Sequence, residues 1–319
     1  MKLCLLLLLA FFGSIEGQLI FQEGQFVERI KEDDPLELGE TFAKGMSCLE
    51  CADWRRASDH FRQVANRCLL PSVRQDAFYY LGYSLYQHGE YDLANEAFSD
   101  YLSSGNSIKY FEDAIGYKFC IAEELRKGAK TRFFGSYQMP KWSSGHSLAV
   151  QIYDEILTLL PAHDYAAHSA YAKGMLLWHL REYQEAVDSF LLLIRRFPKH
   201  ELAPESYVAI SEIYLEQSCC EPQNSDLLAL AQINQRRFTQ EFPRDERLLC
   251  VETNLLKTRE NHAKGLYETG RFYERTCHRH SALFYYRNAV RCYPETRIAE
   301  LCRERLACLG EVSCEAESS

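Results

Sequence analysis

Residue types that could carry out chemistry are few in this sequence, and they lie far apart along the chain. Cys48 and Cys51 form a Cys-x-x-Cys pair, and Cys277 lies beside His278 and His280. A redox Cys-x-x-Cys uses a helix N-terminus to lower the thiol pKa, whereas this pair falls inside a stretch with helical apolar periodicity. A zinc site would need a second pair of ligands at a suitable spacing, and the sequence has none. We therefore expect no redox centre at this pair.

The other polar pairs are explained more simply as solvated surface. His278 and His280 are two residues apart, so they face different directions on a helix. Glu123–Glu124 and Asp33–Asp34 are adjacent carboxylates of the kind that exposed helix faces carry. The sequence has no His-Glu-x-x-His, no Gly-x-Ser-x-Gly and no phosphate-binding glycine loop. We predict a protein with no catalytic residues, no bound metal and no cofactor.

The composition limits the classes of partner. Hydrophobic residues make up 47% of the 319 residues, which is enough for a packed core. Acidic residues outnumber basic ones by 45 to 36, and the formal net charge is −9. A protein that grips phosphates needs a basic face, so we exclude nucleic acid and expect no electrostatic docking on anionic lipid.

Residues 1–17 have the organisation of a secretory signal peptide. Lys2 supplies the positive start, Leu3 to Phe12 form a short apolar core, and small residues follow, among them Gly13 and Gly17. The apolar run is about half the length that spans a bilayer, and a retained membrane anchor is the alternative. We expect an exported chain, because no later stretch is apolar enough to cross a membrane.

An exported chain can form disulfides, and of the 13 cysteines only Cys4 lies in the signal sequence. Their pairing is not readable from spacing, because a bridge requires Cα atoms within about 7 Å. Cys219–Cys220 falls in an expected loop and is the strongest candidate for a reactive or cross-linking pair. The others are Cys48, Cys51, Cys68, Cys120, Cys250, Cys277, Cys292, Cys302, Cys308 and Cys314.

A repeated frame of small and aromatic residues predicts the fold. Its clearest copy has Ala186, Phe190 and Pro198 at 12, 16 and 24 residues after Gly174. Glycine and alanine let two antiparallel helices approach, the aromatic ring fills the gap to the next unit, and proline ends the second helix. This spacing resembles the tetratricopeptide repeat.

The frame recurs along the chain. Its other copies are Gly45–Phe61, Gly82–Phe98, Ala149–Pro161, Ala231–Pro243 and Ala282–Pro294. Each unit buries its apolar face only against a neighbour, so we predict an all-α tetratricopeptide-repeat solenoid: a right-handed superhelix of about six helix-pair units with a concave groove. We find no strand-type alternation.

The domain organisation follows from the frame and its interruptions. We expect a signal peptide (1–17), an N-terminal lead-in (18–39), N-terminal repeats (40–161) with a loop insertion (128–147), additional repeats (162–249), a C-terminal repeat with a closing helix (250–310) and a disordered tail (311–319).

Aromatic residues on first helices are candidates for a peptide-binding groove. Certain positions of a first helix line the concave face, where amphipathic rings suit the capture of an extended segment. The alternative is that they form the core between repeats. The candidates are Tyr79, Tyr83 and Tyr86 in the second unit and Tyr171, Met175 and Trp178 in the fourth.

Several stretches resemble one tetratricopeptide family. Near the C-terminus they are Gly270-Arg-Phe-Tyr-Glu-Arg275 with Ala282, Arg291-Cys-Tyr-Pro-Glu-Thr296 and Leu306-Ala-Cys-Leu-Gly310. Phe133-Phe134-Gly135 and Asp76-Ala-Phe-Tyr-Tyr-Leu-Gly-Tyr83 add to them nearer the N-terminus. These stretches resemble BamD-type (YfiO) proteins over roughly residues 40–161 and 250–310.

The resemblance implies a non-enzymatic periplasmic component of outer-membrane β-barrel assembly. It implies that the C-terminal repeats dock on the POTRA domains of a barrel insertase, and that the N-terminal repeats recognise unfolded barrel precursors. Arg271 and Arg275 are the candidate residues for the C-terminal contact. Two alternatives stay open: another exported adaptor of cell-envelope or cell-wall machinery, and a structural envelope protein cross-linked through its cysteines.

The sequence departs from this family in three places. Members are lipid-anchored through a cysteine at the signal cleavage site, but no cysteine follows Gly17 until Cys48, so we expect membrane association through a partner. Residues 162–249 add about two units. Phe284-Tyr285 stands where the family has Asn-Arg, so that partner contact is not carried over.

Overall fold

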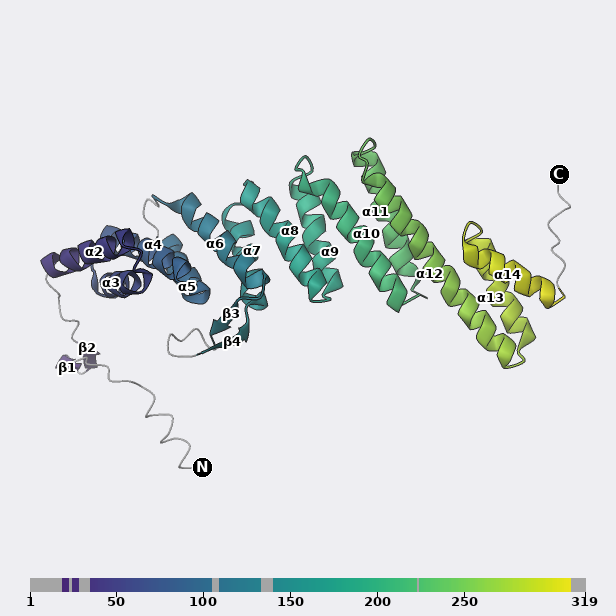
Figure 1. Ribbon diagram of the computed structural model, residues 1–319, viewed down its shortest axis with the longest axis horizontal. Coiled ribbons are helices and arrows are strands. Elements are labelled where there is room, and N and C mark those ends of the chain that lie inside the picture. The colour runs from purple at the N-terminus through teal and green to yellow at the C-terminus, as the bar shows by residue number, and fades with distance from the viewer. Residues whose placement is uncertain are drawn as a thin grey trace, which may run out of the picture. The chain divides into compact units, whose positions relative to one another are not determined.

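The computed structural model describes residues 19–22, 25–28, 35–104, 109–132, 140–222 and 224–310, and Figure 1 shows a succession of helices. The expected signal peptide, the tail and the Phe133-Phe134-Gly135 motif lie outside these residues. Among the described helices, none combines the length and the apolarity needed to cross a bilayer.

The chain divides into two compact units, Met1–Ala114 and Ile115–Ser319, with the division inside a helix. The first unit contains a small hairpin and two helix pairs. Its elements are β1 (Leu19–Gln22), β2 (Gln25–Glu28), α2 (Pro35–Glu50), α3 (Trp54–Arg67), α4 (Pro71–Gln87) and α5 (Tyr91–Ser103).

The second unit begins within α6 (Phe111–Arg126) and contains three further complete pairs and a closing helix. Its other elements are β3 (Lys130–Arg132), β4 (Lys141–Ser144), α7 (His146–Leu159), α8 (Asp164–His179), α9 (Tyr183–Arg196), α10 (Leu202–Cys220), α11 (Ser225–Glu241), α12 (Leu248–Arg275), α13 (Arg279–Cys292) and α14 (Arg297–Cys308). The prediction of a tetratricopeptide-type helical solenoid is confirmed.

The predicted frame works through close contact of a glycine with an aromatic ring. A Cβ atom added to Gly82 on α4 would lie 2.9 Å from the ring of Phe98 on α5, so only glycine fits without a shift. The same contact joins Gly45 to Phe61, Gly174 to Phe190 and Gly270 to Tyr286. The ring therefore packs first on its own pair, whereas we had expected it to fill the gap to the next unit. Phe61 does both, since it also stacks on Tyr80 of α4 at 5.5 Å.

A turn with positive φ recurs between the helices of most pairs, but not among the described residues between α10 and α11. In these turns a residue with positive φ lies two residues after the end of the first helix, and the second helix starts two or more residues later. These residues are Ala52, Gly89, Gly128, Arg181 and Cys277. A residue in the left-handed αL conformation, which glycine adopts most easily, commonly ends a helix. Ala52, Arg181 and Cys277 adopt this backbone conformation although they are not glycine.

The strands are a correction to the sequence analysis. β1 pairs with β2 inside the lead-in, and β3 pairs with β4 inside the insertion, both antiparallel, with an irregularity between Thr131 and Arg132. The hairpins were missed because their strands are three or four residues long, too short to show sustained alternation. A second correction concerns Cys219–Cys220, which form the last turn of α10 and not a loop.

The contact between α10 and α12 is polar where most others are apolar. Asn254 Nδ2 donates to Ser211 Oγ at 3.0 Å, and Asn261 Nδ2 donates to Ser218 Oγ at 2.9 Å. The two serines are seven residues apart on α10, and the two asparagines are seven residues apart on α12. Seven residues are about two helical turns, so the two bonds fix the register of α12 along α10. His262 lies on the same helix, buried, with its Nε2 atom unpaired.

Candidate protein-binding surfaces

The residues that could do chemistry do not form a catalytic arrangement in the described part of the chain. Cys48 lies near the end of α2, and Cys51 lies in the turn that follows it. The pair is therefore at a helix C-terminus, where the helix dipole gives a thiolate no stabilisation. His278 Nδ1 lies 3.1 Å from Thr276 Oγ1, and His280, two residues later in α13, is exposed.

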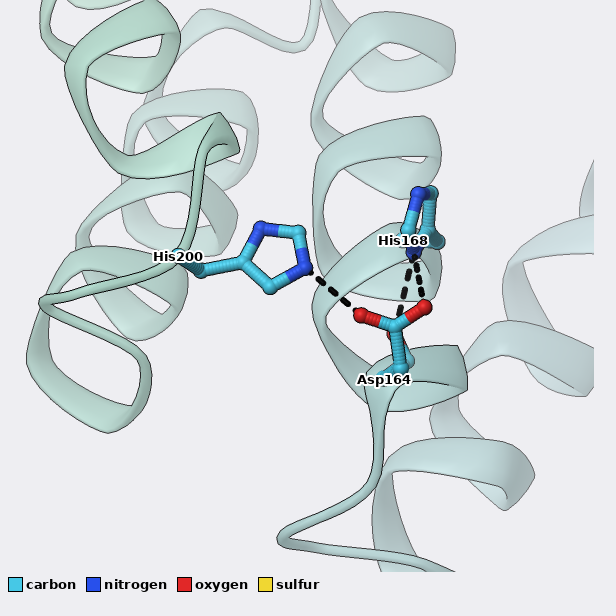
Figure 2. Close-up of side chains that lie close together, drawn as sticks. All are labelled: Asp164, His168 and His200. Atoms are coloured by element: carbon cyan, nitrogen blue, oxygen red, sulfur yellow. Dashed lines mark hydrogen bonds and ion pairs between the residues drawn. The ribbon is translucent and has the colours of Figure 1, made fainter.

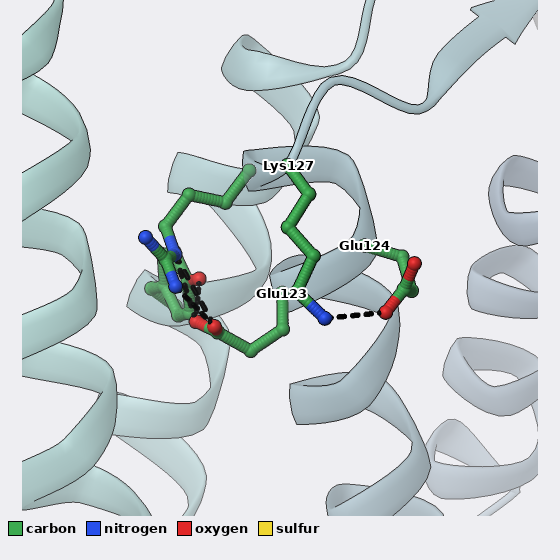
Figure 3. Close-up of polar contacts among 5 residues, drawn as sticks. Glu123, Glu124 and Lys127 are labelled. Carbon is green, nitrogen blue, oxygen red and sulfur yellow. Dashed lines mark hydrogen bonds and ion pairs between the residues drawn. The ribbon is translucent and has the colours of Figure 1, made fainter.

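Glu123 and Glu124 point apart and serve separate ion pairs (Figure 3). Glu123 accepts from Arg126 Nη2 at 2.6 Å and from Tyr153 Oη at 2.6 Å. Glu124 pairs with Lys127 at 2.8 Å. Despite burial, which raises it, the pKa of Glu123 is lowered by these hydrogen bonds, so this carboxyl stays ionised and is not a general acid.

Eleven cysteines within the described residues are free, and none forms a disulfide there. Most are exposed, including Cys219 and Cys220, whereas Cys68 and Cys302 are buried. Burial raises the pKa of the Cys302 thiol to about 12, which makes it inert at neutral pH.

The groove candidates of the first unit lie at different depths. Tyr79 differs from the expectation, because it is only 9% exposed and stacks on Tyr110 at 4.4 Å. Tyr83 is half-buried and packs edge-on against Trp54 at 6.0 Å. Tyr86 is also half-buried and contacts Tyr91. Tyr79 is therefore a core residue, and two of the three rings keep an accessible edge.

The groove candidates of the fourth pair are half-buried along α8. Tyr171, Met175 and Trp178 pack against the core that α8 shares with α9 and α10. Trp178 Nε1 donates to Glu216 on α10 at 2.8 Å, and Tyr183 Oη donates to the other carboxylate oxygen at 2.9 Å. These bonds hold the Trp178 ring in place and leave it at the surface of the α8–α10 contact.

The most exposed aromatic residues of the C-terminal repeat form a row that sequence reasoning did not single out as a site. Phe272 on α12 and Phe284 on α13 are 53% and 62% exposed. Between them, the rings of Tyr273 and Tyr285 stack at 5.5 Å, and each contacts its neighbouring phenylalanine. We call these four residues the C-terminal aromatic surface.

The two arginines predicted to bind a partner flank this surface. Arg271 and Arg275 are exposed and lie four residues apart on α12, on either side of Phe272 and Tyr273 in the sequence. Behind the row, Glu274 accepts hydrogen bonds from Tyr286 and Arg305, which tie α12 to α13 and α14. The surface is therefore presented by helices that are joined by these hydrogen bonds.

The sequence alone indicates this surface only in part. In the sequence, Phe284 stands out only as a departure from the family pattern, and Phe272 only as part of a motif. A second group, Asp164, His168 and His200, was missed altogether, because its members come from two different repeats.

One family model and several solved structures are similar to this chain. A family model for the tetratricopeptide repeat matches residues 76–104, the α4–α5 pair. No curated protein matches the sequence. Similar solved structures include a tetratricopeptide-repeat protein from Parabacteroides merdae (13% identity, 86% of this chain, 100% of that chain, TM-score 0.35). MamA from Desulfovibrio magneticus (12% identity, 68% of this chain, 96% of that chain, TM-score 0.35) and YrrB, described as a protein with an unusual peptide-binding site (14% identity, 70% and 93%, TM-score 0.35), are others.

The matched pair is not unique within the chain. The glycine–aromatic contact of Gly82 and Phe98 inside residues 76–104 recurs between α2 and α3, α8 and α9, and α12 and α13. The family match over residues 76–104 and the repetition of its central contact support a tetratricopeptide-type helical-repeat fold.

Proposed function

We propose that this protein is a non-enzymatic adaptor that docks partner proteins on its C-terminal aromatic surface. The observation that carries the proposal is the exposure of Phe272 and Phe284 on α12 and α13, with the exposed Arg271 and Arg275 near Phe272 on α12. Large aromatic rings and arginines contribute most of the binding energy in protein interfaces, and an isolated monomer gains nothing from exposing them.

The proposal extends to a specific setting. We infer an exported component of outer-membrane β-barrel assembly, in the periplasm, that binds the POTRA domains of an insertase through α12–α14 and unfolded barrel precursors through its N-terminal repeats. Residues 1–17 and the BamD-type stretches at 270–296 and 306–310 support it. Attachment to the membrane would come through the insertase.

The aromatic surface also modifies what the family resemblance implies. Phe284 and Tyr285 occupy the place of a polar Asn-Arg pair. A partner of this chain should therefore offer an apolar pocket for Phe284 with acidic groups at its rim for Arg271 and Arg275, since interfaces match charge at their edges.

In-envelope cross-linking followed by mass spectrometry tests the proposal. Recovery of a POTRA-bearing insertase linked to α12–α14 supports the assembly function. Recovery of peptidoglycan-associated proteins linked to the same helices would support an adaptor role in cell-wall machinery and exclude the role in barrel assembly. High-mass species that disappear with reductant, and no partner at α12–α14, would instead favour a cysteine-cross-linked structural protein.

A further inference from the structure

Three side chains that metals use as ligands converge in the second unit (Figure 2). Asp164 is the first residue of α8, and His168 lies one turn later on the same face. His200 lies in the connection between α9 and α10 and points towards the same carboxylate. His200 Nε2 is 2.8 Å from Asp164 Oδ1, and His168 Nδ1 is 3.4 Å from Asp164 Oδ2.

These separations fit a transition metal. A tetrahedral ion with bonds of about 2.0–2.1 Å to nitrogen and oxygen holds its ligand atoms roughly 3.3 Å apart. The two histidines approach different oxygens of the Asp164 carboxylate, at 2.8 and 3.4 Å, and one ligand atom from each residue lies within 4.8 Å of the others. We propose that Asp164, His168 and His200 bind a divalent transition metal, with water completing its coordination. Two imidazoles and one carboxylate favour Zn²⁺ and its neighbours over Mg²⁺ or Ca²⁺, which prefer oxygen.

Neighbouring rings restrict the orientation of both histidines. His168 lies edge-on to Phe119 of α6 at 6.4 Å and to His200 at 5.3 Å. His200 also contacts Phe197, which caps the end of α9. The side chains are 16% exposed at His200, 38% at His168 and 66% at Asp164. The group is thus held on the histidine side and open on the carboxylate side, where an ion and its water ligand can enter.

Helix capping explains only part of this arrangement. His200 Nδ1 accepts from the amide of Leu202 at 3.1 Å, at the start of α10. His163 has the same role one repeat earlier, where its Nδ1 accepts from the amide of Tyr165 at 3.2 Å. Capping therefore accounts for His200 but not for His168, whose Nδ1 lies 3.1 Å from the backbone carbonyl of Asp164 and 3.4 Å from its carboxylate.

The capping bond determines what metal binding must change. Because Nδ1 of neutral His200 accepts a hydrogen bond, its ring proton is on Nε2 and is donated to Asp164. A metal on Nε2 moves that proton to Nδ1, where it can no longer accept from Leu202. The number of protons on the ring is unchanged, and one capping bond is exchanged for a metal–nitrogen bond. In return, the ion joins α8 directly to the α9–α10 connection.

The test uses the full chain after chelator treatment, titrated with Zn²⁺ and followed by ¹⁵N spectra of the histidine rings. These spectra report each imidazole separately, so zinc bound at exposed cysteines does not interfere. The expected result is a change of His200 from the Nε2–H to the Nδ1–H form, together with shifts at His168. His179, exposed at the end of α8, should not respond.

Two variants complete the test. His200→Asn removes the imidazole but keeps a side-chain oxygen that can cap Leu202, so the fold is retained. His168→Gln removes the second imidazole in a residue that favours helix. Each should weaken zinc binding at this site at least tenfold, whereas His179→Gln should leave it unchanged. If His200 keeps its Nε2–H form at saturating Zn²⁺, or both variants bind as the parent does, the three residues form a capping ion pair and no metal site.

Discussion

The hydroxyl of Tyr286 on α13 donates a 2.8 Å hydrogen bond to Glu274 on α12, at a place where other repeats bury a phenylalanine. The same arrangement occurs between Tyr153 and Glu123 at 2.6 Å. Glu274 lies one turn after Gly270. The corresponding residues in the repeats with phenylalanine are Leu49, Tyr86 and Trp178. The chain thus pairs a buried phenol with a carboxylate and a buried phenyl ring with an apolar or aromatic residue, because a buried hydroxyl needs an acceptor.

Glu274→Leu should destabilise the C-terminal repeat when made alone and much less when Tyr286→Phe is present. The single change leaves a buried hydroxyl without an acceptor, at a cost of about 1–3 kcal/mol, whereas the Arg305 contact is lost in the single and the double variant alike. The double change restores the apolar combination used by the other repeats. Urea unfolding of the parent, both single variants and the double variant measures the coupling. Additive effects would show that the hydroxyl and the carboxylate do not depend on each other.

Alkaline pH should unfold the protein before its buried tyrosines ionise. A hydrogen bond to Tyr110 and burial raise the pKa of Tyr80 to about 12. Burial, the leading cause, also raises the pKa of Tyr153, Tyr207 and Tyr286. These phenols are neutral in the fold, so their contribution is complete below the unfolded value of about 10 and is lost as pH rises above it. Tyrosinate absorbance should therefore rise in two stages, first from the exposed tyrosines near pH 10 and then from the buried ones. The second rise should coincide with loss of helix by circular dichroism. Ionisation of all tyrosines in a single transition near pH 10, with the protein still folded, would contradict this.

Acid should destabilise the second unit through His262, which is buried on α12 near Pro222 and Tyr293. Burial lowers the pKa of this histidine, so the folded state keeps it neutral while the unfolded state takes up a proton. Stability is then complete above the unfolded pKa of about 6.5 and falls as pH drops below it, by at most about 1.4 kcal/mol per pH unit. His262→Gln should reduce this slope between pH 6.5 and 5. His179→Gln, at an exposed site, is the control and should keep the parent's slope; equal slopes in all three proteins would remove His262 as the cause.

Ala52→Gly should stabilise the first unit, although glycine usually destabilises helical proteins. Ala52 has φ 55° in the turn after α2, a conformation that costs a residue with a Cβ about 1–2 kcal/mol. Glycine relieves this strain, but it also raises the conformational entropy of the unfolded chain, which costs about 0.4–1 kcal/mol of stability. We expect a higher Tm for Ala52→Gly. Ala43→Gly, on the exposed face of α2, should lower Tm because it costs about 1 kcal/mol; the same direction for both would contradict the strain.

The fold was predictable because its signals are local. The glycine, alanine and aromatic positions of one repeat lie within 16 residues of each other, and proline follows the second helix, as Pro198 does after α9. The two hairpins were not predictable by the same means. Their strands are too short for alternation to be measured, and β3 and β4 are separated by part of the insertion.

The depth of individual side chains could not be read from the repeat frame. Tyr79 and Tyr83 are both aromatic and one turn apart on α4, yet Tyr110 covers the first ring and Trp54 only flanks the second. The Asp164–His168–His200 group required knowledge of how α8 lies beside the α9–α10 connection. Exposure of Phe272 and Phe284 likewise depends on what α14 leaves uncovered.

Partner capture by variants of the C-terminal aromatic surface tests the central claim most directly. Phe272→Ala with Phe284→Ala removes two exposed rings and should not disturb the core. Leu249→Ala, at a 70% exposed position near the other end of α12, is the matched control. We predict that the amount of partner cross-linked to α12–α14 in the native envelope falls at least tenfold in the double variant. In the control it should equal that of the parent protein, and helix content should be unchanged in both variants. Undiminished capture by the folded double variant would contradict docking at this surface.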